Sequence, residues 1–108
     1  MEKLNIAIAD DNERMVRLLG DIVRSDEELQ VIGTAKDGVE AYELIKTAEP
    51  DVVLLDIVMP KMDGFEVLNV MERKHLIEDI PVIMISSEDS DVYVRRAYEL
   101  GVSDYISR

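Results

Sequence analysis

The sequence predicts an α/β domain with a parallel sheet and helices on both of its faces. Short apolar segments alternate with longer segments of helical periodicity along the chain, and this alternation is typical of doubly wound domains. The segment Val52–Leu55 is apolar at every position, as expected of a strand that is covered on both faces. With 108 residues, the chain is expected to form one domain over residues 1–108.

The first half of the chain predicts two strands and two helices. Leu4–Ala9 is a short apolar strand, and residues 30–35 are a second segment rich in β-forming residues. Glu13–Arg24 has apolar residues at the i, i+3, i+4, i+7 spacing of an amphipathic helix. These apolar residues are Met15, Val16, Leu18, Leu19, Ile22 and Val23. Residues 39–48 show the same periodicity and predict the second helix.

The second half continues the alternation. After Val52–Leu55 we expect a helix over 65–74, a strand over 82–85, a further helix that ends at Leu100, and a last strand over Asp104–Ser107. Asp89 or Ser90 is the expected cap of the helix that ends at Leu100. No helical pattern follows the last strand, although a domain of this kind needs a final helix to cover it. We therefore expect the native polypeptide to continue beyond residue 108.

The composition excludes several classes of function. The chain carries 24 acidic and 12 basic residues, for a net charge of −12. This charge repels nucleic acid phosphates and anionic lipids, so we expect no direct nucleic acid binding and no membrane partner. No apolar run approaches the ~20 residues that span a bilayer, and the opening lacks the pattern of a signal peptide. The absence of Cys agrees with a cytoplasmic location.

Polar residues follow the strands of the predicted sheet. Asp10 and Asp11 follow the first strand, Asp56 the third and Ser86 the fourth, and Arg108 lies at the end of the fifth. In open parallel sheets these positions meet at the edge where ligands bind. Three carboxylates in one place repel each other unless a cation is bound, and Mg²⁺ prefers oxygen ligands together with phosphate. An Asp can also act as the nucleophile that accepts a phosphoryl group.

Four segments carry a resemblance to a known family. Residues 8–12, 54–64, 82–86 and 101–106 resemble the receiver domains of two-component response regulators, in family order and across essentially the whole chain. The most specific segment is the Asp-x-x-Met-Pro-x-Met-Asp-Gly string that begins at Asp56. The resemblance extends to receivers of sporulation-initiation and chemotaxis proteins. It implies a flavodoxin-like fold with a five-stranded parallel sheet in the order 2-1-3-4-5, from which this chain lacks the fifth helix.

The resemblance implies a role for each acidic residue of the site. Asp56 would be the phosphoacceptor and a ligand of Mg²⁺. Asp11 would bind the ion directly, and Asp10 largely through water. The backbone carbonyl of Val58 would be a further ligand.

The same resemblance assigns a switch. Ser86 would bond to a phosphoryl oxygen and move toward the acceptor, and Tyr105 would then turn inward. Arg108 lies at a position where the family usually has Lys, and an Arg is not equivalent to a Lys there.

The resemblance also implies partners. A sensor histidine kinase or a phosphotransfer protein would supply the phosphoryl group, and the output domain would lie outside this chain. The domain would signal and would not be an enzyme that acts on other substrates. Without the final helix, apolar surface of the fourth helix and fifth strand is exposed, and we expect either lower stability or self-association that covers this surface.

Three other functions are open to such a sequence. A Mg²⁺-dependent aspartyl phosphatase would have an Asp-x-Asp arrangement after the first strand, where this chain has Asp10-Asp11-Asn12. A nucleotide-binding domain would need a glycine-rich turn after the first strand, where this chain has Ala9-Asp10-Asp11-Asn12-Glu13. A receiver-like interaction module that is never phosphorylated remains open because of Arg108.

Overall fold

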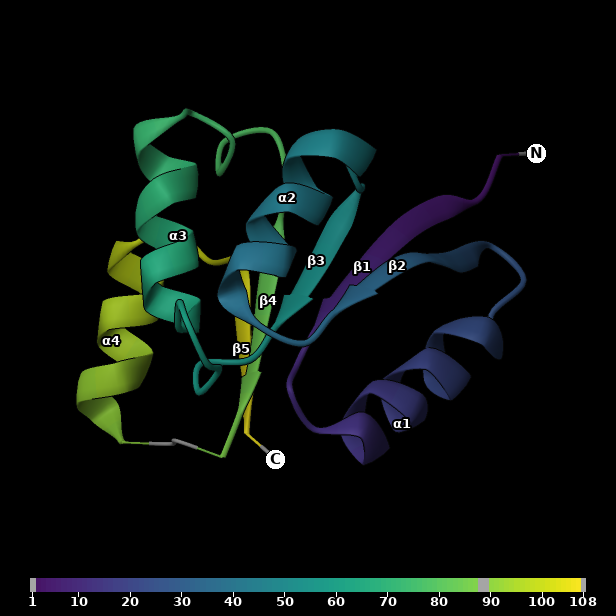
Figure 1. Ribbon diagram of the computed structural model, residues 1–108, viewed down its shortest axis with the longest axis horizontal. Helices are drawn as coiled ribbons and strands as arrows, with labels where there is room; N and C mark the ends of the chain where they lie inside the picture. Colours follow the sequence, from purple (N-terminus) through teal and green to yellow (C-terminus); the bar gives the residue numbers. More distant parts are fainter. Residues whose placement is uncertain (1, 88–89, 108) are drawn as a thin grey trace.

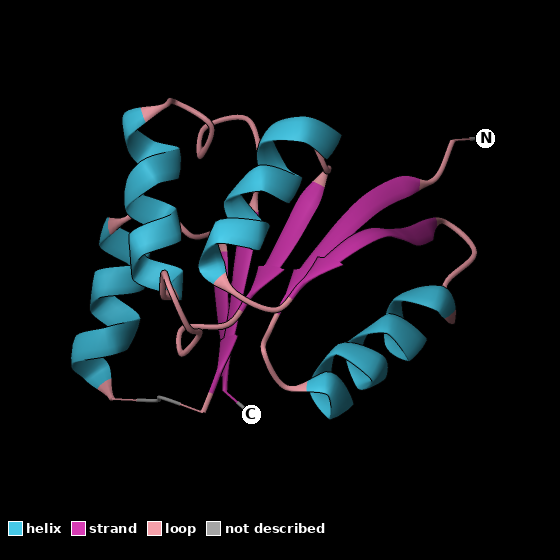
Figure 2. Cartoon of the chain, viewed as in Figure 1, coloured by secondary structure: helices cyan, strands magenta, loops and turns pink. Residues whose placement is uncertain are grey.

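Strands and helices alternate along the chain (Figures 1 and 2). The computed structural model describes residues 2–87 and 90–107. The strands in these ranges are β1 (Leu4–Ala9), β2 (Leu29–Ala35), β3 (Val52–Leu55), β4 (Val82–Ser86) and β5 (Asp104–Ser107). The helices there are α1 (Glu13–Arg24), α2 (Gly38–Ala48), α3 (Gly64–Arg73) and α4 (Asp91–Glu99). The order of elements predicted from the sequence is confirmed, with small differences at the boundaries.

The sheet is parallel, and its strand order is β2-β1-β3-β4-β5, as predicted. The order reverses between β1 and β3, which is where open sheets of this kind bind ligands. Ala9, the last residue of β1, is opposite Ala35 of β2 and Leu55 of β3. Because these neighbouring strands end at the same level, the residues that follow them lie together at one edge.

The two faces of the sheet are covered unequally. Helices α2, α3 and α4 lie on one face, and α1 lies on the other (Figure 1). The larger core lies under α2–α4 and includes fully buried Val53, Leu55, Val82 and Met84. On the side of α1, the β5 edge of the sheet is less covered by the described residues, and Ile106 is 46% exposed there.

The helix α1 is more exposed than its apolar pattern suggests. Leu18 and Ile22 are each more than half exposed, whereas Val23 is buried against Ile6 and Ile8. The apolar stripe of α1 is therefore wider than the strip of the helix that the sheet covers. None of the helices in residues 2–87 and 90–107 has the length and apolar content needed to cross a membrane.

Local polar contacts set where the helices begin. Asn12 caps α1, and its side chain accepts from the backbone N–H groups of Arg14 and Met15 at 3.0 and 3.2 Å. Ser90 caps α4 by accepting from the backbone N–H of Tyr93. Asp89, the other residue expected as this cap, lies outside the described residues.

Candidate functional site

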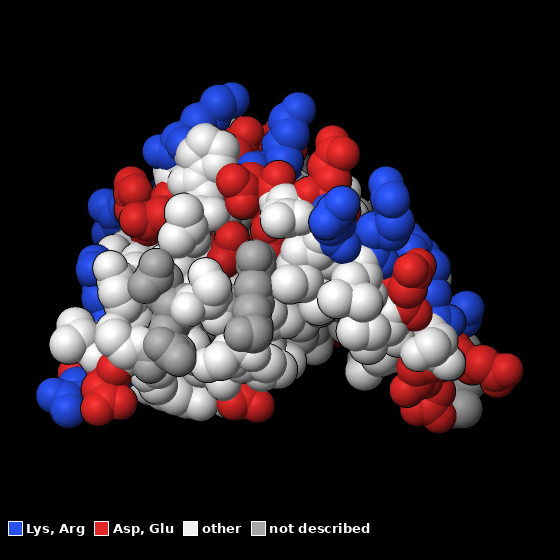
Figure 3. All heavy atoms as spheres, turned by 90° about the horizontal axis from the view of Figure 1, so that it is seen from below, with Lys and Arg blue, Asp and Glu red and all other residues white. Residues whose placement is uncertain are grey.

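The carboxylates of Asp10, Asp11 and Asp56 meet at the carboxyl edge of the sheet. Each offers an oxygen atom that lies within 4.8 Å of the others. Asp10 is 2% exposed and Asp56 is 5% exposed, whereas Asp11 faces solvent. Figure 3 views the molecule from this edge and shows acidic side chains near its middle as well as at its border. The convergence expected from the sequence is therefore present.

Backbone hydrogen bonds hold two of these acids beyond the ends of their strands. The N–H of Asp10 donates to the carbonyl of Ala35 at 3.0 Å, and the N–H of Asp56 donates to the carbonyl of Ala9 at 2.9 Å. The Asp10 carboxylate also accepts from the backbone N–H of Asn12 at 2.9 Å. These contacts extend the sheet by one residue and fix the place from which each carboxylate projects.

Burial makes Asp56 unusually basic for a carboxylate. Its pKa is raised from the ordinary 3.8 to about 6, first by burial and then by the negative charge of Asp11. The backbone N–H groups of Ile57 and Val58 act in the opposite direction. Desolvation and a like charge both disfavour the ionised carboxylate. The site therefore favours any ligand that brings positive charge to it.

The donor set fits a hard divalent cation. Mg²⁺ is usually held by one or two carboxylates together with water and phosphate oxygens, and the cluster of Asp10, Asp11 and Asp56 consists of carboxylates. A groove of about 440 Å³ beside α1 opens onto Asp10 and Asp11. Arg17 and Lys36 line the same groove. The acids can therefore be reached from solvent on this side.

The residues predicted to act as a switch lie on the neighbouring strands. Ser86 is fully buried at the end of β4, beside the strand that carries Asp56. Tyr105 of β5 is opposite Met84 and packs partly buried against the larger core. Paired residues of adjacent strands project to the same face, and so do residues two apart. Ser86 and Tyr105 therefore lie on one face of the sheet, and Arg108 lies outside the described residues.

The loop from β3 to α3 is pinned close to Asp56. The N–H of Gly64 donates to the carbonyl of Ile57 at 2.7 Å. A Cβ atom at Gly64 would lie 2.3 Å from the carbonyl oxygen of Asp56, so a larger residue does not fit without movement. Asp63 caps α3 in a capping box with Glu66. The Asp63-Gly64 pair therefore brings the start of α3 back against the backbone of Asp56 and Ile57.

Sequence reasoning missed two residues near the site. Asp37 reads only as part of a break before a helix, but its carboxylate is buried and caps α2. Its Oδ2 atom lies 3.5 Å from Nζ of Lys61, in the loop that follows β3. The Asp-Gly pair indicates a helix cap, but the contact with Lys61 joins segments far apart in the chain. No local pattern could have indicated it.

Fold and site together define a doubly wound α/β domain with a cluster of three carboxylates at the carboxyl edge of its sheet. Residues 6–108 match the response regulator receiver domain family. The chain belongs to this family and is a receiver domain of two-component signalling.

Relatives and solved structures agree with this assignment. The chain is 40% identical over 109 residues to a protein-glutamate methylesterase/protein-glutamine glutaminase of Pyrococcus horikoshii, covering 98% of this chain and 28% of the relative. The chain thus spans less than a third of that relative and corresponds to its receiver part.

Among solved structures, the response regulator domain of Thermotoga maritima CheB superposes with a TM-score of 0.89 at 33% identity, over 98% of this chain and 78% of that one. CheY in the CheX-CheY-BeF3-Mg complex of Borrelia burgdorferi gives a TM-score of 0.90 at 36% identity, over 99% and 79%.

Proposed function

We propose that this receiver domain accepts a phosphoryl group on Asp56 in a Mg²⁺-dependent reaction. The observation that carries the proposal is the convergence of Asp10, Asp11 and Asp56, with oxygen atoms within 4.8 Å of one another. Asp10 and Asp56 are both buried, but only Asp56 follows the strand that lies between β1, which carries the other two acids, and β4, which carries Ser86. This position suits a nucleophile.

Each acid has a separate task in this proposal. A carboxylate oxygen of Asp56 forms the bond to phosphorus while the bond from phosphorus to the donor breaks and the donor leaves. Asp11 binds Mg²⁺ directly, Asp10 binds it largely through water, and the backbone carbonyl of Val58 is a further ligand. When bound, Mg²⁺ supplies the positive charge that offsets the carboxylates and the transferred phosphoryl oxygens. Asp56 must be ionised to attack, so bound positive charge also favours the reactive form.

The switch uses the two strands beyond β3. In the proposal, Ser86 donates its hydroxyl to a phosphoryl oxygen on Asp56 and moves toward it. Tyr105 then turns inward on the same face of the sheet. This is a shift between two populations of the domain, driven by the new contacts of the phosphoryl group. Arg108 would contribute a positive charge at the phosphoryl group.

The partners in this proposal are a sensor histidine kinase or a phosphotransfer protein, in the cytoplasm. The relative of Pyrococcus horikoshii carries further sequence beyond its receiver part, and an output domain in the same polypeptide is proposed here too. The receiver itself acts on no other substrate. Its net charge of −12 makes direct binding to nucleic acid unfavourable.

Intact mass measurement tests the proposal. The chain is incubated with a small-molecule phosphodonor, with and without Mg²⁺, alongside Asp56→Asn and Asp51→Asn. Asp51 is a matched control because its removal changes the charge equally, but its carboxylate contacts the N–H of Asn5 at the opposite edge of the sheet (2.7 Å). A phosphoryl adduct that requires both Mg²⁺ and Asp56 supports the proposal. An adduct on Asp56→Asn, or none on any chain, contradicts it, and the latter favours a non-phosphorylated interaction module.

A further inference from the structure

The β3–α3 loop is held at a second place, away from Asp56. The turn between β2 and α2 packs directly against it, where the N–H of Gly38 donates to the carbonyl of Pro60 at 3.4 Å. A Cβ atom at Gly38 would lie 2.0 Å from the carbonyl oxygen of Met62, so the two backbones touch. A glycine is required here by this close approach.

Asp37 adds a charged contact to this packing. Its side chain is only 3% exposed, accepts the backbone N–H of Glu40 at 2.8 Å, and lies 3.5 Å from Nζ of Lys61. The hydrogen bond from Glu40 lowers the pKa of Asp37 first, and the charge of Lys61 lowers it further. Lys61 has a φ of 67°, a left-handed conformation that is unfavourable for a lysine. The contact with Asp37 therefore adds to the backbone contacts that hold the loop in this conformation.

Helix capping alone does not explain a charged residue at position 37. Asn caps helices about as well as Asp. The negative charge of Asp37 is therefore not needed for the cap, but it is needed for the ion pair with Lys61. The ion pair joins the turn before α2 to the loop that follows the proposed phosphoacceptor. Its position suggests a role in the site.

The held points lie on both sides of Val58. Gly64 fixes Ile57 through the 2.7 Å hydrogen bond, and Gly38 contacts Pro60. Between these points the chain has little freedom, so the direction of the Val58 carbonyl is set by both contacts. Mg²⁺ demands nearly ideal octahedral geometry, and a ligand on a loosened loop meets that demand less often.

We propose that Asp37 is a positioning residue, which acts through Lys61 to hold the β3–α3 loop in the conformation that binds Mg²⁺. This inference rests on the proposed function, because it assumes that the acidic site binds the ion with the help of Val58. In this inference Asp37 positions the loop and is not one of the ligands of the ion.

The expected effect is modest. Mutation of a residue that directly orients a metal ligand typically weakens metal binding about 10- to 100-fold. Here the Lys61 side chain is 66% exposed, and an exposed ion pair contributes little because solvent screens it. We expect Asp37→Asn to weaken Mg²⁺ binding about threefold. This ratio corresponds to the free energy that an exposed ion pair typically contributes.

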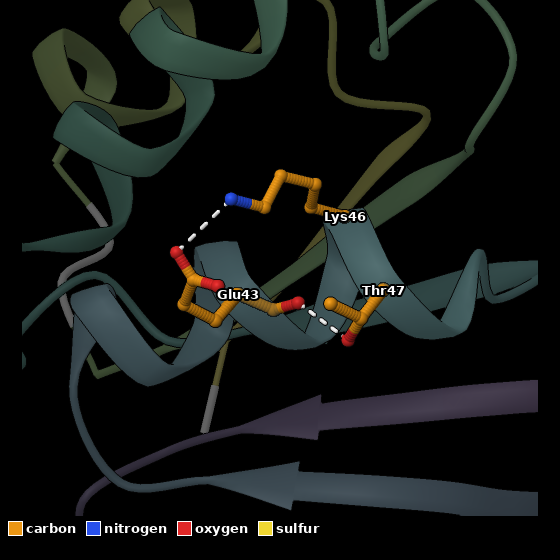
Figure 4. A network of polar contacts seen from close by, with 3 residues as sticks. All are labelled: Glu43, Lys46 and Thr47. Carbon is orange, nitrogen blue, oxygen red and sulfur yellow. Dashed lines mark hydrogen bonds and ion pairs between the residues drawn. The ribbon is translucent and has the colours of Figure 1, made fainter.

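The experiment measures Mg²⁺ dissociation constants by titration of ¹⁵N-labelled protein, followed through the amide signals beside Asp56. The variants are Asp37→Asn, Lys61→Gln and the double variant. The matched control is the Glu43–Lys46 pair of the same helix α2 (Figure 4), in which Lys46 Nζ lies 3.2 Å from Glu43 Oε1. Glu43→Gln, Lys46→Gln and their double variant change the charge equally, on the outer surface of α2.

The inference predicts a specific pattern. Asp37→Asn and Lys61→Gln each weaken Mg²⁺ binding about threefold, the double variant is no weaker than either one, and the control pair has no effect. Urea unfolding of Asp37→Asn without Mg²⁺ stays close to the wild type, because Asn keeps the cap. A purely structural role would instead change the unfolding and leave Mg²⁺ affinity unchanged.

Gly38→Ala provides a stronger perturbation of the same contact. Its Cβ atom would displace the Met62 carbonyl, so we expect about tenfold weaker Mg²⁺ binding by the scale of ligand-orienting contacts. Wild-type affinity in Asp37→Asn and Gly38→Ala, with normal Mg²⁺ binding by the parent chain, overturns the inference and leaves the proposed function intact. A parent chain that does not bind Mg²⁺ overturns both.

Discussion

Replacing Asp56 by Asn should stabilise the metal-free domain at neutral and alkaline pH. In the folded domain the pKa of Asp56 is about 6, compared with an ordinary value of 3.8. The folded state therefore binds this proton more tightly than the unfolded state, and ionisation of Asp56 destabilises the fold. At about 1.4 kcal/mol for each pH unit, the difference between the two values corresponds to about 3 kcal/mol.

The sign of the effect defines the pH range. Above about pH 6 both states are ionised, so the wild type carries the full destabilisation and Asp56→Asn does not. As the pH falls from 6 to 3.8 the carboxylate becomes protonated in the folded state first, and the wild type gains stability relative to the variant. We therefore expect an advantage of up to about 3 kcal/mol for Asp56→Asn at pH 8, which disappears near pH 4.

Urea unfolding in EDTA at a series of pH values measures this difference directly. Acids away from the site are the same in both chains, so their pH dependence cancels in the comparison. Added Mg²⁺ should reverse the order at pH 8, since a ligand of the folded state stabilises it and the wild type keeps the full set of carboxylates. A stability difference that is the same at pH 4 and pH 8 would refute the assignment of the raised pKa to Asp56.

Three further predictions concern residues around the site and the sheet. Val58 is apolar, 58% exposed and two residues after Asp56, the proposed phosphoacceptor. An apolar side chain there would hinder attacking water, so Val58→Asn should shorten the phosphorylated lifetime roughly tenfold, about 1.4 kcal/mol in the barrier. An unchanged decay rate would remove this role. The Arg96 guanidinium lies 4.6 Å from the ring centroid of Phe65. Arg96→Ala should therefore lower the free energy of unfolding in urea by about 1 kcal/mol, whereas Arg95→Ala, at an exposed position without this ring contact, should lower it little. Ile106 is 46% exposed on the sheet, and sedimentation equilibrium should show concentration-dependent association that Ile106→Ser reduces; a monomer at all concentrations would contradict it.

Much of the fold could be predicted because its signals are local. The all-apolar Val52–Leu55 segment indicates a covered strand from its own four residues, and the periodicity of Glu13–Arg24 indicates a helix from one turn to the next. Parallel strands that alternate with helices then bring their carboxyl ends to one edge. For that reason the sequence alone led us to expect that Asp10, Asp11 and Asp56 meet.

The exposure of single residues was less predictable. Leu18 and Ile22 fit the apolar pattern of α1 as well as Val23 does, yet the sheet covers Val23 and leaves the other two more than half exposed. Periodicity gives the direction in which a side chain points around a helix. It does not say how wide a strip of that helix its neighbour covers.

The sequence by itself determined the order of strands and helices, the family, and which acids lie at the binding edge, since each depends on residue type and on spacing along the chain. Only the tertiary structure decided that Asp37 meets Lys61, that Gly38 touches the backbone of Met62, and that Asp56 has a pKa of about 6. Contacts between distant loops and the loss of solvent around a carboxylate depend on how separate segments pack. The free energies of those contacts exist only once the chain has folded.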